Sequence, residues 1–183
     1  GSKQTPLSDG RRDSQFAAHG DVLFPAQSSD VSDIQHVPDG TIDAAGTSGS
    51  GTKVNPQIVR FDGAGSIDQT FADEGIWRPS DVNGELYGLA DPAQPGYVGG
   101  GYVLDDQGSR QLLLVKLTDE GSPDPSFGGQ GLQKVGGLDE DVVAYDLCVL
   151  PDGSQVAVGE MINDEGTSAI MIGHYYRAWR PDR

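Results

Sequence analysis

The stretch GSIDQTFADEG, residues 65–75, decides the fold because the chain contains it three times. Its first copy is GRRDSQFAAHG at residues 10–20, and its third copy is GSPDPSFGGQG at residues 121–131. The shared pattern is G-x-x-D-x-x-F-x-x-x-G, which we call the frame, and its copies are almost evenly spaced along the chain. Even spacing on this scale is typical of repeat architectures. We therefore expect three structural repeats.

A second motif recurs in phase with the frame. Pro-Asp-Gly occurs at residues 38–40 and 151–153, each time between two runs typical of β-strands. Proline presets φ, aspartate hydrogen-bonds to its own backbone and glycine supplies a positive φ, so the motif predicts a tight hairpin turn. The residues that define these two turns are Asp39, Gly40, Asp152 and Gly153.

Short apolar runs of strand length fill the rest of each repeat. About four short strands per repeat is the size and content of a propeller blade. The predicted fold class is therefore an all-β propeller made of three four-stranded, blade-like repeats. The runs that we expect to form strands lie at 20–25, 31–37, 41–46 and 54–61, then 76–78, 85–90, from 97, and 111–117, and finally 132–135, 142–150, 154–159 and 169–175.

The same patterns divide the chain into consecutive parts. Residues 1–9 are polar, which is typical of a poorly ordered tag or leader. The three repeats occupy residues 10–64, 65–120 and 121–176, and residues 177–183 form a basic tail.

The frame, the Pro-Asp-Gly hairpin and a strand ending Arg60-Phe61-Asp62 together resemble the delta-60 repeat, from about residue 7 to residue 176. The second repeat departs from this pattern, because residues 91–96 (DPAQPG) replace the tight turn. The third repeat closes with His174-Tyr175-Tyr176 where the family has Arg-Tyr-Asn. The resemblance implies a β-propeller in a bacterial protein that is secreted, periplasmic or on the cell surface, with its signal segment removed. It implies no catalytic residues.

Three repeats are too few for a closed propeller, which usually has four to eight blades. An open wedge of three blades would expose two apolar faces, which soluble monomers avoid. We therefore expect self-association, with two copies arranged head to tail as a six-bladed ring. The alternatives are that the chain is a piece of a longer array, or an unusual compact β-domain.

Composition limits the partners. The formal net charge is −16, with only 12 Lys and Arg, so nucleic acid is not an expected partner. No apolar run is long enough for a transmembrane helix, so we expect no membrane insertion. The single cysteine, Cys148, excludes an intrachain disulfide and a zinc site built from cysteines.

The frame's carboxylates and aromatic rings allow two interpretations. They could form a ring of calcium or substrate ligands, or each aspartate could close an Asx turn before a phenylalanine that enters the core. Recurrence at one position in every repeat favours the structural role. The residues concerned are Asp13, Phe16, Asp68, Phe71, Asp124 and Phe127.

No cofactor is expected from the remaining polar residues, and calcium stays an alternative. The acidic clusters lack the alternating spacing of a calcium loop. His19, His36 and His174 are far apart along the chain, and no catalytic motif is present.

The most suggestive candidate binding residues lie in the second repeat, which departs from the repeat pattern. They are Tyr87, Asp91, Tyr97 and Tyr102. The predicted function is a non-enzymatic, extracytoplasmic scaffold that binds a protein or a carbohydrate. One alternative is a hydrolase or lyase that acts on polysaccharide through carboxylates in the channel, and another is a purely structural module of a larger surface assembly.

Overall fold

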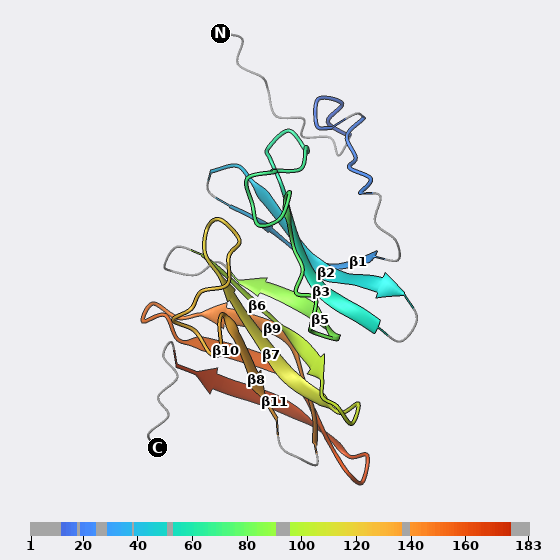
Figure 1. Ribbon diagram of the computed structural model, residues 1–183, viewed down its shortest axis with the longest axis vertical. Coiled ribbons are helices and arrows are strands. Elements are labelled where there is room, and N and C mark those ends of the chain that lie inside the picture. Colours follow the sequence, from blue (N-terminus) through green and yellow to red (C-terminus); the bar gives the residue numbers. More distant parts are fainter. Residues whose placement is uncertain are drawn as a thin grey trace.

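A computed structural model describes residues 12–17, 19–24, 29–37, 39–50, 53–90, 96–136 and 140–176 of the chain. All regular structure in these residues is β, arranged as three antiparallel sheets that follow one another along the chain (Figure 1). Sheet 1 contains β1 (Ser29–His36), β2 (Ile42–Ser50), β3 (Lys53–Phe61) and β4 (Ile76–Trp77). Sheet 2 contains β5 (Gly84–Ala90), β6 (Tyr97–Leu104), β7 (Arg110–Leu117) and β8 (Leu132–Val135). Sheet 3 contains β9 (Glu140–Val149), β10 (Gln155–Asn163) and β11 (Ser168–Tyr175).

The Pro-Asp-Gly turns join the first two strands of sheets 1 and 3, as predicted. Gly40 and Gly153 both have positive φ, at 97° and 82°. Their N–H groups donate to the carbonyls of Val37 and Leu150, at 2.9 and 2.8 Å. The corresponding connection in sheet 2 lies outside the described residues, and so does Asp91.

The short strands that follow the frames join a different sheet from the one predicted. The repeat pattern predicts that residues 76–78 open the second repeat, but Ile76 and Trp77 pair with β3 of sheet 1. In the same way, β8 pairs with β7 of sheet 2 instead of opening the third sheet. In sheets 1 and 2 the chain thus leaves the sheet after its third strand, forms the frame, and returns to add the outer strand. The sheets are therefore shifted along the chain relative to the sequence repeats.

Two further predictions differ from the structure for the same reason. Residues 21–24, predicted as part of a strand, are not in one, because the described chain contains no earlier sheet for them to complete. Sheet 3 contains three strands in the described residues instead of the four predicted, since no described segment adds an outer strand to β11.

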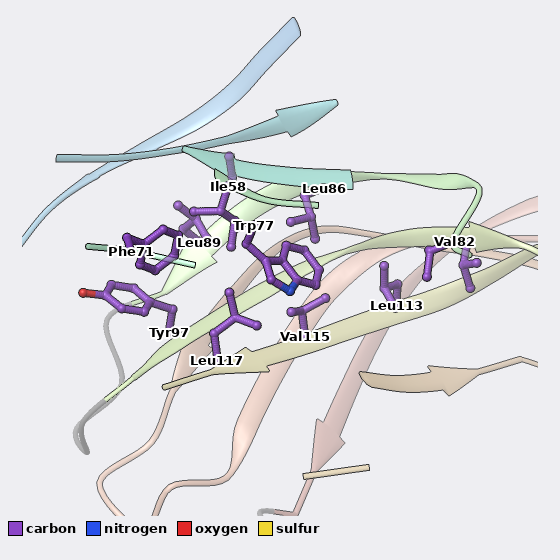
Figure 2. Close-up of a cluster of buried hydrophobic side chains, with 12 residues drawn as sticks. Ile58, Phe71, Trp77, Val82, Leu86, Leu89, Tyr97, Leu113, Val115 and Leu117 are labelled. Atoms are coloured by element: carbon purple, nitrogen blue, oxygen red, sulfur yellow. The ribbon is translucent and has the colours of Figure 1, made fainter. Parts of the chain in front are cut away.

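Sheet 2 lies between sheets 1 and 3, and one apolar cluster fills each junction (Figure 1). Figure 2 shows the cluster between sheets 1 and 2, where Trp77 and Phe71 meet side chains of β5, β6 and β7. The cluster between sheets 2 and 3 contains Phe127, Leu112 and Leu114 together with Ala144, Leu147 and Ala157. Each sheet is too thin to bury its own side chains, so its apolar residues are buried by the neighbouring sheets.

The frames lie at the edge of the junctions between sheets, and successive frames contact one another there. Phe71 and Phe127 are fully buried. The N–H of Ala72 donates to the carbonyl of Glu120 at 2.7 Å, and the N–H of Ala17 donates to that of Ala64 at the same distance. Successive frames are therefore linked through their backbones. Among the described residues, no helix is long and apolar enough to cross a membrane.

Candidate binding site

Each sheet carries a β-bulge at the same place in its first strand. The pairing register skips one residue in each of these strands, namely Ser32 in β1, Tyr87 in β5 and Tyr145 in β9. A bulge leaves the extra residue unpaired and redirects its side chain. Two of the three redirected side chains are tyrosines, and both lie at the junction of sheets 2 and 3.

The second strand accommodates each bulge with a glycine. These glycines are Gly46, Gly101 and Gly159. A Cβ at these positions would overlap the carbonyl oxygen of Asp30, Glu85 or Val143, respectively. The close approach of two backbones therefore requires glycine here. This explains why a second glycine, Gly46 or Gly159, follows six residues after the glycine of each Pro-Asp-Gly turn in sheets 1 and 3.

Three tyrosine rings, tilted by 40° and 52° against one another, form a continuous stack across this junction, which we call the tyrosine site. The ring centroids of Tyr87 and Tyr145 are 5.7 Å apart, and those of Tyr87 and Tyr102 are 6.0 Å apart. The guanidinium of Arg110 lies over the ring of Tyr102, 5.1 Å from its centroid. Tyr102 is buried, Tyr87 is partly buried and Tyr145 is half-exposed, so the stack leads from the core to the surface.

Carboxylates accept hydrogen bonds from the hydroxyls of this stack. The hydroxyl of Tyr145 donates to Oε2 of Glu160 at 3.0 Å, and this hydrogen bond, with a smaller effect of burial, raises the pKa of Tyr145. Burial and the hydrogen bond to Glu85 raise the pKa of Tyr87 above its usual value. Burial and the charge of Glu85 raise the pKa of Tyr102 to about 12. The phenols therefore stay protonated at neutral pH, and the site presents aromatic faces beside carboxylate acceptors.

The predicted binding residues do not all meet in one place. The structure brings Tyr87 and Tyr102 together but places Tyr97 at the other junction, between sheets 1 and 2. There Tyr97 packs edge-on against Phe71, with ring centroids 5.9 Å apart, and it is almost fully buried. Sequence patterns do not group Tyr145 with the stack, although it occupies the equivalent bulge in the sheet after that of Tyr87.

A buried ion pair occupies the junction where Tyr97 lies. Nε of Arg60 is 2.9 Å from Oδ1 of Asp43, and one terminal nitrogen of Arg60 donates to the carbonyl of Asp119 at 2.8 Å. The guanidinium also lies over the ring of Phe71, 4.0 Å from its centroid. Burial raises the pKa of Asp43, and the hydrogen bond from Arg60 opposes this effect. The pair is closed off from solvent, so it offers no access to a ligand. It links β2 to β3 within sheet 1, and the hydrogen bond to Asp119 ties this sheet to the segment that follows β7.

The aspartates of the frames and hairpin turns all accept hydrogen bonds from the residue two positions later. Oδ1 of Asp68 accepts from the backbone N–H and the hydroxyl of Thr70, at 3.0 and 2.6 Å, and Asp124 accepts in the same way from Ser126. Asp13 accepts from the N–H of Gln15 at 2.9 Å. Asp39 and Asp152 form the equivalent bonds with Thr41 and Ser154. These bonds engage the carboxylates in local turns.

Other features of the described residues are weaker candidates for a binding site than the tyrosine site. In the parts of the chain that the structure covers, no three His, Cys, Asp or Glu side chains are grouped to hold a metal ion. An open groove of about 690 Å³ lies between the second and third frames, with Trp77, Arg78, Glu74 and Pro123 among its lining residues. The indole of Trp77 is buried, so the groove exposes mainly polar groups and backbone.

Comparison with known families adds to this description. Residues 38–71 and 97–127 match the family model of DUF5122, a β-propeller domain of unknown function. Each matched segment holds the second and third strands of one sheet and the start of the frame that follows. Together with the three antiparallel sheets, the match supports a β-propeller repeat fold. No curated protein matches the sequence significantly.

Proposed function

We propose that the protein is a binding scaffold and that the tyrosine site binds a neutral carbohydrate. The half-exposed ring of Tyr145, stacked on Tyr87 and hydrogen-bonded to Glu160, carries this proposal. An aromatic face packs against the C–H face of a sugar ring, because both are apolar and flat. The carboxylates of Glu85 and Glu160 then serve as acceptors for sugar hydroxyls. The net charge of −16 disfavours anionic ligands at the same surface.

A panel of neutral oligosaccharides tests this role, with binding measured by calorimetry. Tyr145→Ala is expected to weaken the best ligand at least tenfold, because the exposed stacking face is lost. Tyr145→Phe, which keeps the ring, should retain most of the affinity. Glu160→Gln should weaken binding, whereas the matched control Glu165→Gln, on the exposed turn between β10 and β11, should not. If no member of the panel binds, the carbohydrate proposal fails and the purely structural role gains support.

The same panel also addresses the enzymatic alternative. A scaffold should return each oligosaccharide unchanged after prolonged incubation. Release of shorter products that stops in Glu160→Gln would instead point to hydrolysis through the carboxylates beside the stack.

The wider setting of this scaffold is also a proposal. The repeats belong to the delta-60 type, and two copies of the three-sheet unit complete a six-bladed ring. The blade number of closed propellers and the apolar faces at both ends of the sheet array support this arrangement. Light scattering should give a particle of about twice the 19.2 kDa chain mass, and a monomer in dilute buffer would contradict ring closure.

The proposed location is outside the cytoplasm of a bacterial cell, as the delta-60 resemblance implies. Fractionation of the source cells, followed by immunodetection, should find the protein in the periplasm, on the surface or in the medium. Detection in the cytoplasmic fraction alone would contradict this location.

A further inference from the structure

The outer face of sheet 1 exposes residues whose counterparts in sheet 2 are buried. Val31 and Ile34 on β1 are 68% and 66% exposed. Their equivalents on β5, placed identically around the bulge, are Leu86 and Leu89, which are 0% and 8% exposed in the junction with sheet 1. The outer face of sheet 1 is thus built like a face that packs against a preceding sheet.

The outer face of sheet 3 shows the same mismatch in the opposite direction. Ile170 and Ile172 on β11 are 87% and 72% exposed. Their equivalents on β7, Leu112 and Leu114, are fully buried in the junction with sheet 3. This face is therefore built like one that packs against a following sheet, and the two outer faces are complementary.

In the part of the chain that the structure covers, the outer edge of β11 lacks the fourth strand that completes sheets 1 and 2. The frame segments supply β4 to the edge of β3 and β8 to the edge of β7. In the described residues no strand pairs with the outer edge of β11. Residues 20–24 follow the first frame as β4 follows the second, yet they pair with no strand, and the ring of Phe24 lies edge-on to that of Phe61 in β3 with centroids 6.3 Å apart.

We propose that residues 20–24 of a second copy form the fourth strand of sheet 3, antiparallel to β11, while the outer face of sheet 3 packs against the outer face of sheet 1 of that copy. This inference rests on the proposed self-association and names the surfaces that carry it. This one contact would pair the free backbone edge of β11 and bury the exposed side chains of Ile170 and Ile172. Repeating the contact through a two-fold axis closes the ring.

The two observed outer strands set the register. Ile58 pairs with Trp77 in sheet 1, and Leu114 pairs with Gln133 in sheet 2. The equivalent positions in the proposed contact are Ile172 and Val22 of the second copy. The pair one step further, Val115 with Leu132, corresponds to Gly173 with Asp21.

A side-chain link between the first strands of sheets 1 and 2 supports the same arrangement. Oδ2 of Asp33, the residue after the bulge of β1, accepts from the N–H of Leu89 in the next sheet at 2.8 Å. The equivalent residue after the bulge of β9 is Asp146, and it is exposed. In the proposed contact Asp146 lies opposite β1 of the second copy, as Asp33 lies opposite β5.

Charge complementarity provides a second link. Nζ of Lys116, at the end of β7, lies 2.6 Å from Oδ2 of Asp124 in the frame that follows. The equivalents of these residues are His174, at the end of β11, and Asp13 in the first frame. Nε2 of His174 is 2.8 Å from Oγ of Ser154, which leaves Nδ1 for another partner. The proposed contact brings Asp13 of the second copy beside His174, where its carboxylate can accept a hydrogen bond from the imidazole.

Disulfide trapping tests the register in a Cys148→Ser background. Val22→Cys combined with Ile172→Cys should yield a disulfide-linked dimer as the main species on a non-reducing gel, because directly paired strand residues meet the geometric needs of a disulfide. The control Leu23→Cys with Ile172→Cys should remain mostly unlinked, since a one-residue slip places the side chains on opposite faces.

Hydrogen exchange on the unmodified protein provides a second readout that needs no variant. In the dimer, the outward N–H groups of β11 should be protected about as well as those of β7, because both edges are paired. Light scattering could show a dimer while the engineered disulfide fails to form and the amide hydrogens of β11 exchange rapidly. That result would overturn the pairing of residues 20–24 with β11 but leave self-association standing. A monomer, or a disulfide within one chain, would overturn both.

Discussion

Nε of Arg60 and Oδ1 of Asp43 lie 2.9 Å apart in a junction between two sheets where neither side chain reaches solvent. Removing one partner leaves a buried charge without compensation, which typically costs about 3–5 kcal/mol. We expect Asp43→Asn to lower the free energy of unfolding by about 3 kcal/mol, measured by urea denaturation. Asp164→Asn, on an exposed turn, is the matched control and should change it by less than about 0.5 kcal/mol. Equal effects of the two substitutions would contradict this account of the pair.

Acid stability should depend on Asp124. Partial burial alone would raise the pKa of this carboxyl, but hydrogen bonds from Lys116 and Ser126 outweigh burial and lower the pKa to about 2. A group with a lowered folded-state pKa contributes stability that is complete above its unfolded pKa of about 4 and is lost as the pH falls toward 2. The melting temperature of Asp124→Asn should therefore lie below that of the wild type at about pH 6 and approach it at about pH 2. A difference that does not change with pH would refute this role.

The bulge in β5 makes a sharp prediction about glycine. Gly101→Ala places a Cβ against the carbonyl oxygen of Glu85, and backbone atoms of the bulge cannot move aside without breaking the pairing. We expect a loss of about 3 kcal/mol in unfolding free energy, the upper part of the usual range for overpacking. Gly99→Ala on the same strand is the control, because its new Cβ meets the flexible side chain of Leu86 at 3.3 Å. Chemical denaturation should show a clearly smaller loss for the control.

The three frame phenylalanines should differ although their sequence positions are equivalent. Phe71 and Phe127 are buried in complete junctions, so substitution by alanine should cost about 3–5 kcal/mol each. Phe16 is only partly buried in the described structure, and its substitution in a monomer should cost less. Thermal melts of the three variants, recorded at low protein concentration, should rank Phe16→Ala as the mildest. A loss at Phe16 as large as that at Phe71 would contradict the ranking.

Local chemistry explains what can be predicted from the sequence. Turns depend on nearest neighbours, so the Pro-Asp-Gly hairpins and the Asp-Phe spacing of the frame are recognisable without any tertiary information. Short apolar runs also mark most of the strands. The match to a β-propeller family and the antiparallel sheets agree with the all-β repeat fold at this level.

The sheet membership of β4 and β8 could not be predicted, because chain adjacency does not determine hydrogen-bond partners. Trp77 follows the second frame in sequence, yet its pairing partner Ile58 precedes that frame. For a related reason, the sequence predicts Tyr87 and Tyr102 as binding residues but does not group Tyr145 with them. Tyr87 and Tyr145 meet because each lies at a bulge, and a bulge leaves no simple signature in the alternation of side chains.

The return of β4 and β8 to the preceding sheet has a consequence for how such chains grow. Duplication of a gene segment that encodes one sequence repeat does not add a self-contained sheet. It adds three strands of a new sheet and the outer strand of the one before, so the product of each duplication is interlocked with its neighbour from the start. Recombination that cuts inside a frame would separate the outer strand β4 or β8 from its sheet, whereas a cut between β4 and β5 or between β8 and β9 would leave whole sheets on both sides.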